Sequence, residues 1–423
     1  MTLVTSLISQ MLLARYIGPG KDLDRYFSAF GFSSAVLGGV IVATTFLVPA
    51  YVARQQVEKG PESAALAAGE AMAAFCCCAV ILIAFGNLLL AGLRCYRPDL
   101  AKWSQEWFIS CISWAAAFLT IITSALAAIG VAHKVITLPM VLGMLPTAFV
   151  ATYLLVTTNP TVEYTAAASV GGVLTQAVLL ACLMRHKWTL KQVTWPATRG
   201  LMKSIPIAAV GALCFSGYAA VDAVLGSALG DSVLSHQALG QRLVIAFGSV
   251  LSAGPFLLAP TKLGALVATR QWAAIIQYIE RSSLTMVALT TVSYFLMPSV
   301  GALIIRYMFQ HGTFSAADTQ AVAAVVQVLL LGAGPMLATA IVFRALHAVH
   351  HRSHVAAISV IWFTAYILLS VCLMDSLSSM SLAVSYTISW AITFTGALIY
   401  IKSALGKNIE GDSNEGPTPL PII

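Results

Sequence analysis

Long apolar stretches follow one another along almost the whole chain, with short polar segments between them. A helix needs about 20 apolar residues to cross the core of a bilayer, because its backbone amides must be hydrogen-bonded within the segment. Twelve stretches reach or approach this length: 2–17, 26–52, 64–93, 106–130, 134–157, 163–184, 204–229, 232–260, 282–309, 317–343, 355–374 and 379–401. The pattern predicts an all-α integral membrane protein with about 12 transmembrane helices.

The composition supports this class. Hydrophobic residues make up 59% of the 423 residues and charged residues only 9%, whereas soluble domains carry about 25% charge. The net charge is +7, but no basic segment is interleaved with aromatic residues, so we expect no nucleic-acid partner. The bilayer itself is the expected partner.

The distribution of Lys and Arg predicts the orientation, since these residues are enriched in cytoplasmic loops. With the N-terminus inside, most of the 23 Lys and Arg residues fall in inside loops or in the C-terminal tail. Segment 185–203 is especially basic, whereas the outside loops near Asn159, Asp231 and Asp375 contain neither Lys nor Arg. We therefore expect both termini in the cytoplasm, and the residues after Met1 do not resemble a cleavable signal peptide.

The chain shows signs of an internal repeat. The residues Ala125–Ile129, at the end of the fourth stretch, resemble Ala345–Val349, at the end of the tenth. Two parallel halves of six helices are an architecture that transporters use, with the substrate site at the interface of the halves. We expect an N-terminal lobe, a basic cytoplasmic linker, a C-terminal lobe and a disordered tail at 1–184, 185–203, 204–403 and 404–423, with a central cavity between the lobes.

No motif for catalysis or cofactor binding is found, and we expect neither an enzyme nor a bound cofactor. The eight cysteines lie mostly in apolar runs and are expected to pack as small apolar side chains. Four histidines, His347, His350, His351 and His354, have the spacing of one helical face and could bind a metal, but a location at the membrane interface is the simpler interpretation.

One polar segment carries a family resemblance. Residues Met308–Thr319 read MFQHGTFSAADT, which resembles the F-x-x-G-x-F-[ST]-x-x-D-T pattern of the MviN/MurJ-type lipid II flippases. The segment LARYIGPG, Leu13–Gly20, followed by Asp24, resembles the family's opening helix and first loop. Independently of the family, Ser315 and Asp318 are expected to form a capping box at the start of the next helix.

The resemblance implies the multidrug/oligosaccharidyl-lipid/polysaccharide exporter superfamily. It predicts a transporter of the bacterial inner membrane that flips an anionic lipid-linked glycan such as a peptidoglycan precursor. The chain also departs from the family. The family's second helix carries paired arginines and a Glu, whereas Ser33–Val40 here is uncharged, and twelve spans stand where the flippases usually have fourteen.

Charged residues within the spans are candidate functional residues, because inserting a charge into a bilayer costs at least about 2.5 kcal/mol. Arg242 is the strongest candidate for binding a phosphate, since a guanidinium can form two parallel hydrogen bonds with it. Asp222 could couple transport to Na⁺ or H⁺ or act as the counter-ion of Arg242. Glu70 is a second candidate for ion coupling, although an acidic residue near a helix start also has a structural explanation.

Arg15 and Arg25 flank the first outside loop and could help to bind an anionic head group; extension of their side chains toward the interface is the simpler alternative. Two other functions remain open. A cation-coupled multidrug or metabolite antiporter would depend on Asp222 and Glu70, whereas a non-transporting scaffold of envelope synthesis would depend on the tail at 404–423. We expect the protein to be a monomer.

Overall fold

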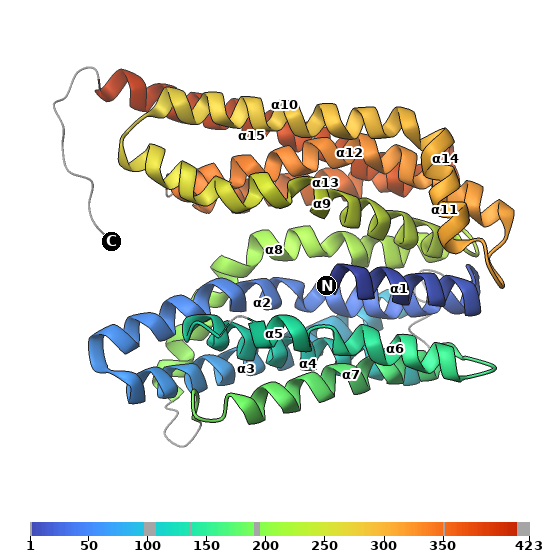
Figure 1. Cartoon of the computed structure of the whole chain (residues 1–423), viewed down its shortest axis with the longest axis horizontal. Helices are drawn as coiled ribbons and strands as arrows, with labels where there is room; N and C mark the ends of the chain where they lie inside the picture. The colour runs from blue at the N-terminus through green and yellow to red at the C-terminus, as the bar shows by residue number, and fades with distance from the viewer. Residues whose placement is uncertain (1, 97–106, 136, 190–194, 350–351, 413–423) are drawn as a thin grey trace. The chain divides into compact units, whose positions relative to one another are not determined.

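The computed structural model describes residues 2–96, 107–135, 137–189, 195–349 and 352–412, and in these residues it contains helices and turns but no β-strand. Figure 1 labels the helices along the chain. The first half contains α1 (Thr2–Tyr16), α2 (Lys21–Lys59), α3 (Pro61–Tyr96), α4 (Trp107–Ala132), α5 (Thr137–Leu142), α6 (Leu145–Val156) and α7 (Val162–Leu183). The second half contains α8 (Trp195–Leu229), α9 (Val233–Ala268), α10 (Trp272–Leu296), α11 (Ala302–Phe309), α12 (Ala316–Ala348), α13 (Arg352–Cys372), α14 (Met374–Leu377) and α15 (Ser381–Asp412).

The predicted membrane spans coincide with these helices. Each of the twelve apolar stretches corresponds to one helix or to two adjoining helices. In the described part of the chain, nine helices or joined helices are long and apolar enough to cross a membrane. The expected all-α membrane fold is confirmed.

Two predicted spans are interrupted, and a proline explains each interruption. The stretch 134–157 divides between α5 and α6, because Pro146 cannot donate a backbone hydrogen bond to the carbonyl of Leu142. The stretch 282–309 contains a π-helical turn, Met297–Gly301, between α10 and α11. Pro298 lies in that turn, where it likewise removes one backbone donor.

Two helices extend beyond the predicted spans. Residues 195–203 of the predicted linker form the start of α8, where Pro196 is well suited to the first helical turn. Residues 404–412 of the predicted disordered tail continue α15, because no proline interrupts the helix before Pro417. The rest of that tail, 413–423, lies outside the described residues.

The chain packs as two compact units. The first contains Met1–Leu239 and Ile304–Ala321, and the second contains Gly240–Leu303 and Val322–Ile423. The boundaries of the predicted lobes, 1–184 and 204–403, remain predictions.

In the first unit, α2 is the central helix and packs against α3, α4 and α8. In the second unit, α13 packs against α15 around an aromatic cluster formed by Trp362, Tyr366, Tyr386 and Trp390. The ring centroids of Trp362 and Trp390 are 4.7 Å apart, and such ring pairs add to the energy of burial.

Candidate functional site

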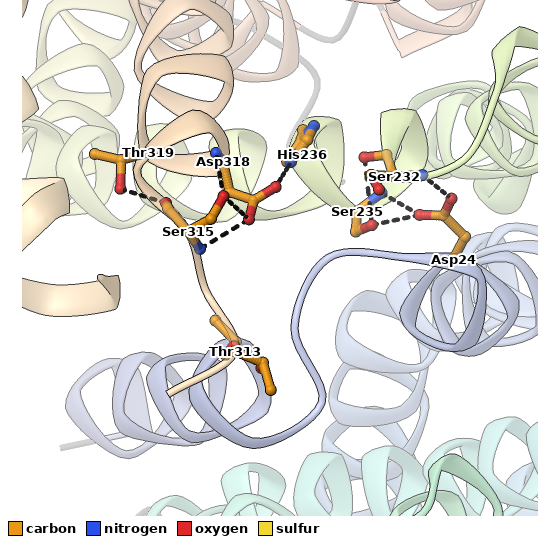
Figure 2. Close-up of polar contacts among 9 residues, drawn as sticks. Asp24, Ser232, Ser235, His236, Thr313, Ser315, Asp318 and Thr319 are labelled. Atoms are coloured by element: carbon orange, nitrogen blue, oxygen red, sulfur yellow. Dashed lines mark hydrogen bonds and ion pairs between the residues drawn. The ribbon is translucent and has the colours of Figure 1, made fainter. Parts of the chain in front are cut away.

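Three connecting segments, distant in the sequence, meet at one end of the first unit (Figure 2). They are the segment between α1 and α2, the segment between α8 and α9, and the segment between α11 and α12. We call their contact region, around Asp24, Ser235, Thr313 and Asp318, the three-loop cluster. The charge pattern of the sequence predicts that this end faces the outside of the cell.

Asp24, in the first turn of α2, caps the start of α9. Its Oδ2 accepts a hydrogen bond from the backbone N–H of Ser232 at 2.7 Å, and its Oδ1 accepts one from the backbone N–H of Ser235 at 2.7 Å. The Ser235 hydroxyl also donates to Oδ1. The first N–H groups of a helix have no partner within the helix, and a carboxylate also interacts favourably with the helix dipole. Asp24 therefore joins the first turn of α2 to the first turn of α9.

Ser315 and Asp318 form the predicted capping box at the start of α12. The Asp318 backbone N–H donates to Ser315 Oγ at 3.2 Å, and the Ser315 backbone N–H donates to Asp318 Oδ2 at 2.9 Å. The second carboxylate oxygen of Asp318 lies 2.9 Å from His236 Nε2. His236, near the start of α9, thus links the starts of α9 and α12.

Two glycines allow the segment before α12 to approach the end of α1. The Thr313 backbone N–H and hydroxyl both donate to the Arg15 carbonyl at 3.0 Å. Gly312 has φ +66°, and a Cβ atom there would lie 2.2 Å from the Arg15 carbonyl oxygen. Gly18 has φ +75°, and a Cβ atom there would lie 2.6 Å from Thr313 Oγ1. A side chain at either position would disrupt the contact, which explains Gly18 and Gly312 in the two family-like segments.

The uncharged segment of α2 fits closely against α8. The Ser216 hydroxyl donates to the Ala35 carbonyl at 3.1 Å, and a Cβ atom on Gly38 would lie 2.6 Å from Ser216 Cβ. A Cβ atom on Gly31 would lie 3.1 Å from the Ala219 carbonyl oxygen. We call these five residues the α2–α8 seam. The seam gives a packing reason for small residues where the family has charged ones.

Arg15 and Arg25, the two arginines predicted to help bind an anionic head group, have different surroundings in the structure. Arg15 is exposed, with its guanidinium carbon 5.5 Å from the centre of the Tyr16 ring. Arg25 pairs with Asp22 at 2.8 Å and with Glu163 at 3.3 Å. These carboxylates offset the charge of Arg25 and connect α2 to the start of α7.

Asp222 and Arg242 belong to different units. Asp222 is buried in α8 of the first unit, and Arg242 is half-buried in α9 of the second unit. Their pairing therefore stays a prediction. Gln241, next to Arg242, lines a pocket of about 10 Å³ in the second unit together with Val244, Ile245, Leu329, Met336 and Tyr386. That volume is close to the space of one water molecule.

Glu70 is buried between α3 and α2. Its Oε2 accepts a hydrogen bond from the Tyr51 hydroxyl at 2.7 Å, so the side chain lies well inside the unit and not at a solvated helix start. Its role in ion coupling stays a prediction.

Sequence reasoning assigned no role to Asp24, Ser232 or Ser235. A local signal existed, since serines precede the apolar run of α9 as helix caps often do. Their partner, however, lies 211 residues from Ser235, and spacing along the chain could not indicate it.

Comparison with known proteins identifies the family. The model of the lipid II flippase MurJ family matches residues 13–413. The fold resembles a solved lipid II flippase MurJ in an inward closed conformation, with a TM-score of 0.71 and 16% identity over 95% of this chain and 86% of that chain. It also resembles an inward-facing multidrug resistance MATE family transporter, with a TM-score of 0.65 and 11% identity over 96% of both chains.

A transporter described as a member of the MOP superfamily, from Pyrococcus furiosus, has a TM-score of 0.62 and 12% identity over 95% of this chain and 92% of that chain. No curated protein matches the chain by sequence. At these identities the structural likenesses establish the fold, and the family model establishes the membership. This multi-pass membrane protein belongs to the lipid II flippase MurJ family.

Proposed function

We propose that this protein flips an anionic lipid-linked glycan precursor, lipid II or a close relative, from the inner to the outer leaflet of the bacterial inner membrane. The family match over residues 13–413 is the observation that carries the proposal. Movement of two lobes about a substrate site, which opens in turn to each side, is the mechanism that such transporters use. The protein acts without catalysis, as a monomer with both termini in the cytoplasm.

Arg242 is the proposed phosphate-binding residue. It is half-buried on α9, and its planar guanidinium can donate two parallel hydrogen bonds to a diphosphate. Arg15 is exposed and can assist at the outer end, whereas Arg25 already binds two carboxylates and contributes mainly to structure. Asp222 positions Arg242 or couples transport to Na⁺ or H⁺, and Glu70 is the second candidate for coupling.

The three-loop cluster supports alternating access. Its hydrogen bonds join the starts of α2, α9 and α12, which come from both halves of the sequence. In this proposal, outward release of the substrate breaks some of these contacts. Because the contacts are few and made by polar groups, they can form and break within a transport cycle.

The proposal is tested by complementation of a strain depleted of its own lipid II flippase. We expect wild type to restore growth and Arg242→Ala to fail at equal membrane levels, with partial rescue by Arg242→Lys, which retains the charge but not the paired hydrogen bonds. Arg281→Ala, which removes an exposed arginine from α10, is the matched control and should rescue. Failure of well-expressed wild type would contradict transport of lipid II.

A cation-coupled antiporter is the second candidate. The uncharged α2–α8 seam and the likeness to a multidrug MATE transporter favour it. Export of a drug that survives Arg242→Ala but not Asp222→Asn would support this function over the first.

A further inference from the structure

A group of basic residues gathers at the end of the first unit away from the three-loop cluster. The start of α7 lies near the cluster, because Glu163 pairs with Arg25. Helix α7 contains 22 residues, which corresponds to about 33 Å of helix between its start and its end. There the backbone N–H of Thr189 donates to the Ala65 carbonyl at 3.1 Å, so this end also contains the start of α3.

Two helix ends form this basic group. After α4 the chain makes a tight turn in which the Val135 N–H donates to the Gly130 carbonyl at 2.8 Å. After α7 the Lys187 N–H donates to the Met184 carbonyl at 2.8 Å. The His133 imidazole lies close to Lys187, to both its backbone and its charge, and within electrostatic range of His186, which brings the two turns together. We call the basic and aromatic residues of these turns the inner basic site: His133, Lys134, Arg185, His186, Lys187 and Trp188.

The inner basic site is electropositive and contains polar atoms that can serve a ligand. The pKa of His133 lies below its ordinary value because the imidazole is partly buried and because Lys187 and His186 repel a further positive charge. His133 Nε2 and Trp188 Nε1 are buried, and neither has a hydrogen-bond partner in the described part of the chain. Trp188 Nε1 can only donate, so an anion would satisfy it and relieve the repulsion among the cations.

Exposed apolar side chains adjoin the site. Leu183, in the last turn of α7, is 51% exposed, and Leu179, one turn earlier on the same face, is 38% exposed. Val131, in the last turn of α4, is 47% exposed. A ligand with a phosphate at the turns would therefore have apolar protein surface for its acyl chains. Free phosphate would make no use of that surface.

We propose that the inner basic site binds the phosphate of an anionic phospholipid in the cytoplasmic leaflet. Lys187 and Lys134 supply charge, Trp188 donates a hydrogen bond from its indole N–H, and the acyl chains lie along the exposed face of α7. Basic groups between transmembrane helices on the cytoplasmic side are suited to such lipids. The assignment depends on the orientation of the chain and not on the identity of the transported substrate.

The test measures binding of phosphatidylglycerol and phosphatidylcholine to the purified full-length protein by native mass spectrometry. We expect wild type to bind phosphatidylglycerol more tightly than phosphatidylcholine. Lys187→Gln should weaken phosphatidylglycerol binding about fivefold, the effect of one lysine near an anionic lipid. Trp188→Phe, which keeps the ring but removes the N–H group, should weaken it by a smaller factor, and Lys187→Arg should retain it.

Lys402→Gln is the matched control. It removes a partly exposed lysine that pairs with Glu280 in the second unit, and it should leave phosphatidylglycerol binding unchanged. The proposal is overturned if Lys187→Gln and Trp188→Phe together leave phosphatidylglycerol binding intact, or if Lys402→Gln weakens it equally. Displacement of phosphatidylglycerol by equimolar inorganic phosphate would also overturn the proposal. So would a Lys187→Gln protein that binds undecaprenyl diphosphate more weakly than wild type but binds phosphatidylglycerol equally well.

Discussion

Asp24 lies in the first turn of α2, but the groups that it binds begin another helix. Its carboxylate accepts hydrogen bonds from Ser232 and Ser235, and it is 9% exposed. The capping box of Ser315 and Asp318 could be predicted because both residues lie within one turn. The Asp24 cap could not, since helix-capping patterns are read over a few neighbouring residues and this contact joins two distant segments.

We expect Asp24→Ala to lower the free energy of unfolding by about 1–2 kcal/mol, because two backbone N–H groups lose their acceptor. Asp24→Asn, which keeps one good acceptor, should lose less. Thermal unfolding of the purified protein in detergent measures both. Asp22→Ala is the matched control. Asp22 is exposed and its pair with Arg25 is worth less than about 1 kcal/mol, so an equal loss in both alanine variants would contradict the capping role.

Helices were the most predictable elements of this chain. Apolar length alone located the long helices, because a bilayer permits few other backbone structures. The sequence could also have predicted the helix interruptions at Pro146 and Pro298, since proline removes a backbone donor. The sequence did not predict which helices pack against each other. Nothing in the run Ser33–Val40 indicates that its small residues face α8, because every helix of this chain is rich in small apolar residues.

The α2–α8 seam gives a prediction at the scale of helix packing. Gly38→Ala should lower the free energy of unfolding by about 1–3 kcal/mol, because the new methyl group would overlap Ser216. Gly92→Ala is the control in α3, where no atom lies within 4 Å of the added Cβ. It should be neutral or stabilising by up to about 1 kcal/mol, as alanine favours helix. A Gly38→Ala protein as stable as Gly92→Ala would show that α2 and α8 do not pack this closely.

At the scale of the whole molecule, sequence and family together identify a transporter class. Arg242 and Asp222 could be found from the sequence because charge is rare in a membrane span. Whether they pair with each other could not be predicted, since they lie on different helices and in different units. Glu70 illustrates the same limit, because its hydrogen bond to Tyr51 depends on how α2 and α3 pack.

The predicted orientation is testable by reporter fusions. A green fluorescent protein fused to the C-terminus should fluoresce, because it folds in the cytoplasm and not after export. Alkaline phosphatase inserted at Asn159 should be active, whereas the same insertion at Trp188 should be inactive. The opposite pattern at Asn159 and Trp188 would reverse the orientation and would place the inner basic site in the outer leaflet.

The chemistry of the Asp24 cap has a consequence for the environments in which the protein can work. Its carboxylate binds uncharged N–H and O–H groups and is buried, so dissolved ions screen these bonds little. The nearby pair of Lys21 and Asp231 is 77% and 67% exposed, and the Debye length falls from about 30 Å at 0.01 M salt to about 3 Å at 1 M. When a cell passes from fresh water to brine, the rise in salt concentration therefore weakens the exposed pair of Lys21 and Asp231. The hydrogen bonds that join α2 to α9 stay nearly unchanged.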